Sequence, residues 1–213
     1  MSTGADPSNF YRERVPAQFN RTFVEQKAMA EAGDTDAARV LEAMRTVNAT
    51  IEVTVDDDAV YHLNVGGGQM QAGDANSHPP FMKMRHDLAS FAVLERESGD
   101  SVLSFLGGLA GMTEDMRLTS GRIQNLHGIQ GSLLFELTGG KAFSVLVHFG
   151  DASASDTPDS DTPDCHIIVD GASYDQLRSG ELGPQDAFLG GQIQVEGDMM
   201  IGMQVALAAL SPE

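Results

Sequence analysis

Apolar positions in the first fifty residues recur at helical spacing. Val15, Phe19 and Phe23 lie four residues apart, directly around a proline that can open a helix. The Gly-Asp-Thr run at 33–35 combines a helix stop with a new N-cap, and apolar residues at helical spacing follow it. We therefore predict a helical hairpin over residues 1–50.

The hydrophobic period changes to two after this segment, which is typical of β-strands. Apolar residues alternate over 51–55 and 61–65 around a turn of three aspartates, and again over 133–137 and 143–147 around Gly139-Gly140. Each pair of runs predicts a β-hairpin. Each hairpin is followed by a long, turn-rich loop and then a short apolar strand.

One pattern after these loops occurs twice. Asp-x-Ala-Ser-Phe-x-x-Leu at 87–94 returns 83 residues later as Asp-x-Ala-Ser-Tyr-x-x-Leu at 170–177, and Phe-Leu-Gly-Gly at 105–108 returns with the same offset at 188–191. Two separated blocks that match in one register indicate an internal duplication. We predict that residues 87–108 and 170–191 share one structure.

The second copy continues further than the first. Gly180 can end a helix, and Pro184 can begin the next. Residues 192–196 then alternate as a strand, and Asp198 can cap a final helix with methionines and leucines along one stripe.

These patterns predict an α/β protein of the α+β type, with mostly antiparallel sheets covered by helices and two half-domains in tandem. The predicted units are the helical hairpin at 1–50, a first and degenerate repeat at 51–115, and a second repeat at 116–213. Only the second repeat carries the full final helix.

Charge excludes several partners. The chain has 31 acidic and 13 basic residues, a formal net charge of −18, and Arg178 is the single base among twelve acids after residue 141. Such a chain repels phosphate backbones and anionic headgroups. We expect no nucleic-acid partner and no stable membrane anchoring.

Cysteine content and the amino-terminal sequence point to a compartment. Cys165 is the single cysteine, so no internal disulfide is possible, and the first residues lack a basic leader followed by an apolar run. The sequence therefore predicts a cytoplasmic protein.

Motifs for chemistry are weak. The six histidines lack the paired helical spacing of a zinc site, and no nucleophile elbow or phosphate loop is present, so we predict no metal, no cofactor and no assigned catalytic residue. One alternative stays open. His148 and His166 could be neighbours on adjacent strands and, with Asp170, form an acid–base group for an enzyme of the cyclase or isomerase type.

The second half resembles the sterol carrier protein type 2 (sterol-binding) domain family. The resemblance rests on the hairpin at 131–148, the strand at 165–169, the Tyr174 and Leu177 pair, and above all the run Ala-Phe-Leu-Gly-Gly-Gln-Ile-Gln-Val-Glu-Gly-Asp-Met at 187–199. Residues 51–115 resemble the family more faintly, through the duplication.

The resemblance implies an α/β fold whose internal cavity holds a lipid, a sterol or another apolar small molecule. It implies binding at Phe188, Leu189, Ile193, Val195, Met199, Met203 and Leu207. A third possibility is a non-catalytic interaction module whose cavity is filled by its own side chains. The ligand and the oligomeric state stay open at this point.

Overall fold

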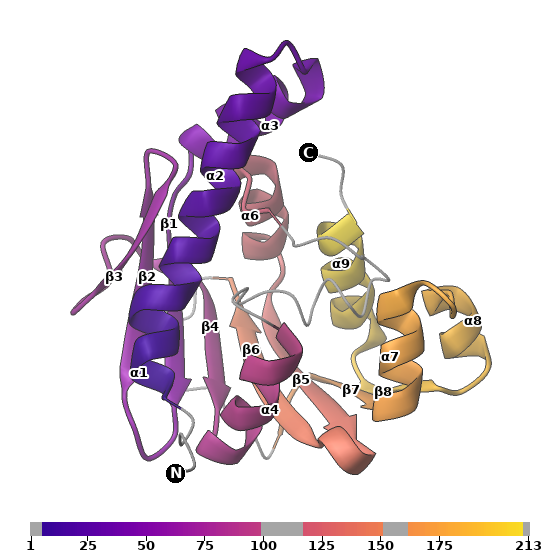
Figure 1. Ribbon diagram of the computed structural model, residues 1–213. Helices are drawn as coiled ribbons and strands as arrows, with labels where there is room; N and C mark the ends of the chain where they lie inside the picture. The colour runs from indigo at the N-terminus through magenta and orange to yellow at the C-terminus, as the bar shows by residue number, and fades with distance from the viewer. Residues whose placement is uncertain (1–5, 99–116, 151–161, 211–213) are drawn as a thin grey trace.

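A computed structural model describes residues 6–98, 117–150 and 162–210. Its strands form one sheet in the order β3-β2-β1-β4-β6-β5-β7-β8 (Figure 1). The strands are β1 (Asn48–Val55), β2 (Val60–Gly66), β3 (Gln69–Gly73), β4 (Pro80–His86), β5 (Gly131–Thr138), β6 (Phe143–Phe149), β7 (Cys165–Asp170) and β8 (Ile193–Gly197).

The helices lie between and around these strands in the sequence. They are α1 (Pro7–Asn9), the π-helical turn η1 (Phe10–Arg14), α2 (Val15–Glu31), α3 (Thr35–Arg45), α4 (Leu88–Ser98), α6 (Ser120–His127), the 3-10 turn η2 (Gly139–Lys141), α7 (Gly171–Ser179), α8 (Pro184–Leu189) and α9 (Met199–Leu210).

Both halves of the sheet have the same local arrangement. β1 pairs antiparallel with β2 and parallel with β4, and β5 pairs antiparallel with β6 and parallel with β7. Within the described residues, five of the seven strand pairings are antiparallel, which confirms the expected α+β class with mostly antiparallel pairing.

The two halves share one sheet, whereas the sequence predicted separate sheets in two half-domains. β4 and β6 join them in antiparallel register, with Met82 opposite Phe149 and Met84 opposite Val147. This pairing satisfies backbone groups that the edge of either half would otherwise leave open. Residues 105–108, part of the repeated pattern, lie outside the described residues, and the duplication and the domain bounds stay predictions.

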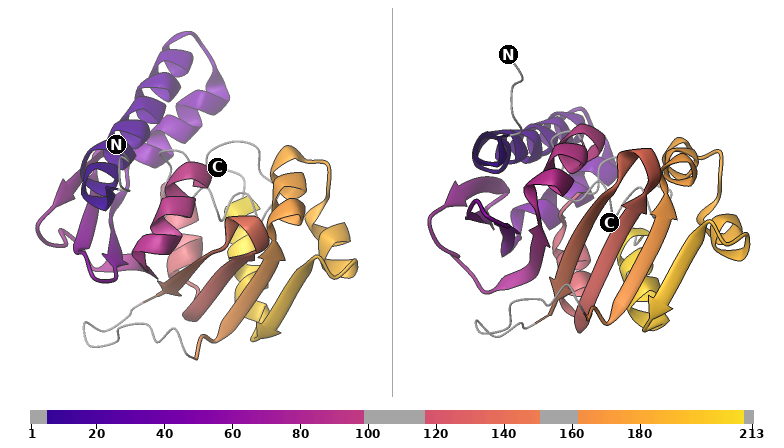
Figure 2. Two further views of the ribbon diagram at one scale, coloured as in Figure 1. Left: turned by 60° about the horizontal axis from the view of Figure 1, so that its bottom comes forward. Right: turned by 90° about the horizontal axis from the view of Figure 1, so that it is seen from below.

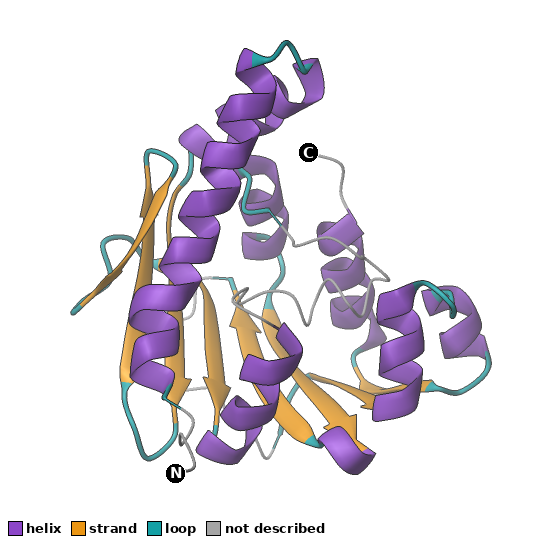
Figure 3. Cartoon of the chain, in the orientation of Figure 1, coloured by secondary structure: helices purple, strands orange, loops and turns teal. Residues whose placement is uncertain are grey.

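Helices cover one face of the sheet (Figures 1 and 3). The ring of Phe135 on β5 contacts Tyr174 of α7, and the ring of His86 on β4 stacks on Phe91 of α4. The core therefore lies between this face and the helices, where each fully buried large apolar side chain contributes about 1.5–3 kcal/mol. The two further views in Figure 2 show α4 and α7 on the same side.

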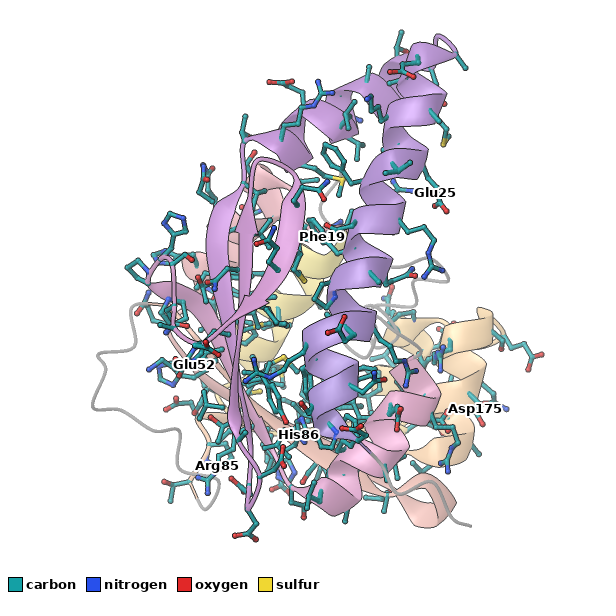
Figure 4. All side chains as sticks on the ribbon, turned by 60° about the vertical axis from the view of Figure 1, so that its left-hand side comes forward. Phe19, Glu25, Glu52, Arg85, His86 and Asp175 are labelled. Carbon is teal, nitrogen blue, oxygen red and sulfur yellow. The ribbon has the colours of Figure 1, made fainter. Side chains whose placement is uncertain are left out.

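The other face of the sheet is polar. Glu52 and Arg85 project from it, whereas His86 points toward the helices (Figure 4). Arg85 pairs with Asp56 at 2.8 Å, and Lys83 lies 3.9 Å from Glu52. Strand alternation thus divides the side chains into one core face and one charged face.

The amino-terminal segment packs more tightly than its sequence pattern indicated. Helical structure begins at Pro7, before the predicted helix, and Phe10 and Tyr11 are fully buried. Further along, Phe23 of α2 packs with Met44 of α3 in a smaller apolar cluster. The capping carboxylate of Asp34 accepts the backbone N–H groups of residues 36 and 37 and begins α3.

Candidate functional site

A pocket of about 570 Å³ lies at the β8 end of the sheet, beneath α8 and α9. Nearly all of its lining is apolar. The lining residues are Ile167, Pro184, Gln185, Phe188, Ile193, Val195, Met199, Gly202, Met203, Val205, Ala206 and Leu207. A volume of this size is typical of small-molecule sites.

Local signals in the sequence place α8 against this pocket. Gly180 adopts the left-handed conformation, with φ of 75°, and ends α7. Pro184 occupies the first turn of α8, and buried Ala187 holds this short helix against the core. Phe188 on the neighbouring position then lines the pocket.

The start of α9 is held by a glycine and two aspartates. Gly197 has a φ of +78°, and a Cβ there would overlap the carbonyl oxygen of Asp164. Asp198 donates its backbone N–H to that same carbonyl at 2.7 Å, and its carboxylate accepts the N–H of Met200 at 2.9 Å. These bonds tie α9 to the beginning of β7.

Two faces of α9 are apolar, and they have different roles. Ile201, Val205 and Ala208 are buried in the core. Met203 and Leu207 lie on the adjoining face, where they line the pocket yet stay 51% and 63% exposed. The open side of the pocket is therefore bounded by flexible apolar side chains, which suits variable ligands.

The structure brings together six of the seven residues that the family resemblance implied. Phe188, Ile193, Val195, Met199, Met203 and Leu207 all line the pocket. Leu189 does not, because it is the last residue of α8 and its side chain is 75% exposed. With no ligand present, the assignment of these residues to binding stays a prediction.

Sequence reasoning missed part of the lining. Ile167 contributes from β7, and Val205 contributes from the core face of α9. Ile167 belongs to the short apolar strand that the sequence predicted, but Ile168 and Val169 beside it are apolar too, so the pattern did not single it out. Pro184, Gln185, Gly202 and Ala206 were not identifiable, because nothing in their local pattern distinguishes a pocket wall from a surface.

The proposed acid–base group is not assembled, which corrects the alternative raised from the sequence. β5 lies between β6, which carries His148, and β7, which carries His166. His166 Nε2 lies 2.9 Å from Glu136 Oε2 on the polar face. Asp170 instead caps α7 by accepting two backbone N–H groups, the first at 3.0 Å.

The residues that line the pocket are uncharged. None of the described residues that line it carries a titratable side chain. Cys165 is fully buried on β7, and this burial raises the pKa of its thiol, so it is a poor nucleophile. The Asp170 pKa is lowered by hydrogen bonds from the Ser173 hydroxyl and backbone, as expected of a cap.

Two other features are absent from the described ranges, a cluster of metal ligands and a membrane-spanning helix. No group of three or more His, Cys, Asp or Glu residues there could hold a metal ion. Across 6–98, 117–150 and 162–210, no helix has the length and apolar character needed to cross a membrane.

Comparison with protein families identifies the part of the chain that contains the pocket. Residues 117–209 match the SCP-2 sterol transfer family. The matched segment includes α6, the strands β5 to β8 and the helices α7 to α9. The resemblance seen in the second half is thus confirmed for these residues.

One curated relative is similar to part of the chain. "Sterol carrier protein 2" of Rattus norvegicus is 28% identical over 92 residues, which are 43% of this chain and 17% of that protein. The chain therefore matches less than a fifth of the length of this curated relative.

Solved sterol carrier structures align with about half of the chain. "Sterol Carrier Protein 2 Like 2" of Aedes aegypti aligns with 15% identity and a TM-score of 0.31, over 52% of this chain and 95% of its own. "Sterol Carrier Protein 2" of Yarrowia lipolytica, in its apo form, gives 16% identity and a TM-score of 0.32, over 50% and 89% of the two chains.

Proposed function

We propose that this protein binds or carries a lipid, a sterol or another apolar small molecule in the pocket between β8, α8 and α9. The observation that carries the proposal is the pocket itself, which has about 570 Å³ and an almost wholly apolar lining. Transfer of an apolar ligand into such a space removes its surface from water and is favourable by roughly 25 cal/mol per Å².

The family match supports the same ligand class. It covers the residues that build the pocket, and the rat relative is named for carrying sterol. Whether this chain takes a sterol, an acyl chain or another apolar molecule is part of the proposal.

We further propose that the chain arose by duplication and that its first half is scaffold. The elements support this, because β1 (Asn48–Val55) and β5 (Gly131–Thr138) have bounds 83 residues apart, as do β2 and β6. In the first half, Phe10, Tyr11 and Phe91 contact one another with ring centroids 4.9 to 5.9 Å apart. These aromatic side chains fill the space above the sheet.

Two other functions are less well supported. The first is an interaction module whose cavity is filled by its own side chains, and the pocket of about 570 Å³ argues against it. An enzyme acting on an apolar substrate would need an acid or a base at the pocket, and the described lining offers only apolar groups and one amide, Gln185.

The test is direct. Full-length protein is stripped of lipid, and saturable binding of the neutral apolar dye Nile red is measured by fluorescence, followed by displacement with cholesterol and with oleyl alcohol. We expect one saturable site per chain and displacement by at least one of the two. No saturable binding of the dye or of either lipid contradicts the proposal.

A further inference from the structure

A second hollow lies on the opposite flank of α9. This groove, of about 390 Å³, runs between α6 and α9. Its lining residues are Gln124, Asn125, Gly128, Ile129, Gln204, Leu207 and Ala208. Leu207 lines both the groove and the apolar pocket, so the two spaces adjoin at this exposed side chain.

The groove differs from the pocket in its chemistry. Three of its lining side chains are amides, namely Gln124, Asn125 and Gln204, and all three are exposed. An amide both donates and accepts hydrogen bonds but carries no charge. The two adjoining spaces thus offer an apolar compartment and a mixed one, in which uncharged amides stand beside apolar residues.

The described side chains that line the two spaces carry no positive charge. Among the described lining residues of the pocket and the groove, none is Lys, Arg or His. Arg178 is the single base after residue 141, and it donates to the backbone oxygen of Glu97 at 2.6 Å and lies 5.8 Å from the ring of Tyr174.

The carboxyl ends of two helices also make the groove unfavourable for an anion. The groove is lined by the last turn of α6, which ends at His127, and by the second half of α9, which ends at Leu210. The carboxyl ends of helices carry partial negative charge, which disfavours an anion and favours a hydrogen-bond donor.

We infer that the ligand is an uncharged amphiphile, such as a long-chain alcohol, a sterol or a monoacylglycerol, rather than a fatty-acid anion or an acyl thioester of an anionic carrier. Its chain occupies the apolar pocket, and its hydroxyl-bearing head crosses Leu207 into the groove. This inference rests on the proposed function. A carboxylate placed there would lose water, and none of the described residues that line the groove carries a positive charge to compensate that loss.

The experiment compares three ligands with the same chain and different heads. Oleyl alcohol, 1-monooleoylglycerol and oleate are each titrated against full-length protein with bound Nile red at pH 8, below their aggregation concentrations. We expect the two neutral lipids to displace the dye with dissociation constants at least about tenfold lower than that of oleate.

A charge variant tests the position of the head. Gln204→Lys places a cation at the groove, and because Gln204 is exposed the fold should tolerate it. We expect oleate to gain at least about fivefold in affinity while oleyl alcohol changes less than twofold. Gln176→Lys on α7 is the matched control, because Gln176 is also exposed but lines neither space.

The outcomes distinguish a wrong ligand class from a wrong function. Equal affinity for oleate and the neutral lipids, or an equal gain in both lysine variants, overturns the inference and leaves the proposed function standing. Absence of saturable binding by the dye and by all three lipids overturns both.

Discussion

Gly202 of α9 lies directly over Cys165 of β7. A Cβ at Gly202 would be 3.4 Å from the Cys165 sulfur and 3.5 Å from Cδ1 of Ile167, which is ordinary van der Waals contact. The space between α9 and β7 therefore admits a methyl group at this position but not a larger side chain, unless the helix moves.

This contact predicts a limit to the size of the side chain at position 202. Gly202→Ala should be tolerated, because its methyl group fits and alanine favours the helix by about 0.5–1 kcal/mol. Gly202→Leu should lower the free energy of unfolding by about 1–3 kcal/mol, because it forces α9 away from β7. Urea denaturation measures both, and equal stability of the two variants would contradict the close approach.

Two glycines with similar backbone conformation make a matched pair. Gly197 and Gly191 have φ of +78° and +76°, but a Cβ at Gly197 would overlap Asp164, whereas Gly191 has nothing within 4 Å. Gly191→Ala should cost about 1 kcal/mol of stability from its left-handed conformation alone. Gly197→Ala should cost at least about 1 kcal/mol more, as measured by urea denaturation, and an equal loss would argue against the overlap.

Elements with local signals were predictable from the sequence. The aspartates at 34 and 198 were predicted as helix caps, and their carboxylates accept backbone N–H groups at the starts of α3 and α9. The final helix and β8 were predicted from their periods, and they supply most of the residues that line the pocket. Short-range rules suffice for such features.

Features set by long-range pairing were not predictable. The register that joins β4 to β6 depends on two segments about 60 residues apart, and hydrophobic alternation is compatible with many partners. Long-range pairing also explains why His148 and His166 were wrongly expected on adjacent strands, because only the strand order shows that β5 lies between them. The groove beside α9 was missed since it forms between α6 and α9, which are distant in sequence.

A buried histidine predicts a pH dependence of stability. His86 Nε2 lies 2.6 Å from Tyr11 Oη, and burial lowers the His86 pKa despite the opposing charges of Asp87 and Asp56. The unfolded chain then binds the proton more readily, so stability is complete above about pH 6.5, the unfolded pKa, and falls as the pH decreases below it.

Two variants test the origin of this dependence. His86→Gln should flatten the slope of unfolding free energy between about pH 6.5 and 5. Tyr11→Phe should lower stability at neutral pH, because it removes the donor to His86, while the slope remains. Chemical denaturation at several pH values distinguishes them, and an unchanged slope in His86→Gln would assign the dependence to other groups.

Net charge predicts weak attachment to anionic membranes. At physiological salt the Debye length is about 8 Å, so the repulsion of a chain with a formal charge of −18 persists at contact. We expect negligible co-sedimentation with phosphatidylserine vesicles in 150 mM salt, and the same for binding to duplex DNA in a mobility-shift experiment. Retention of the protein by acidic vesicles would contradict this expectation.

The placement of the ligand in the second half gives the sharpest comparison, between two neighbouring methionines of α9. Met203 lines the pocket, whereas Met200 is 58% exposed and does not. Met203→Glu puts a carboxylate at the apolar wall with no cation nearby, so Nile red affinity should fall at least about tenfold. Met200→Glu adds the same charge one turn away on the same helix, and its affinity should change less than about threefold. Because both side chains are partly exposed, circular dichroism should show that both variants fold, and equal affinities in the two variants would place the ligand elsewhere.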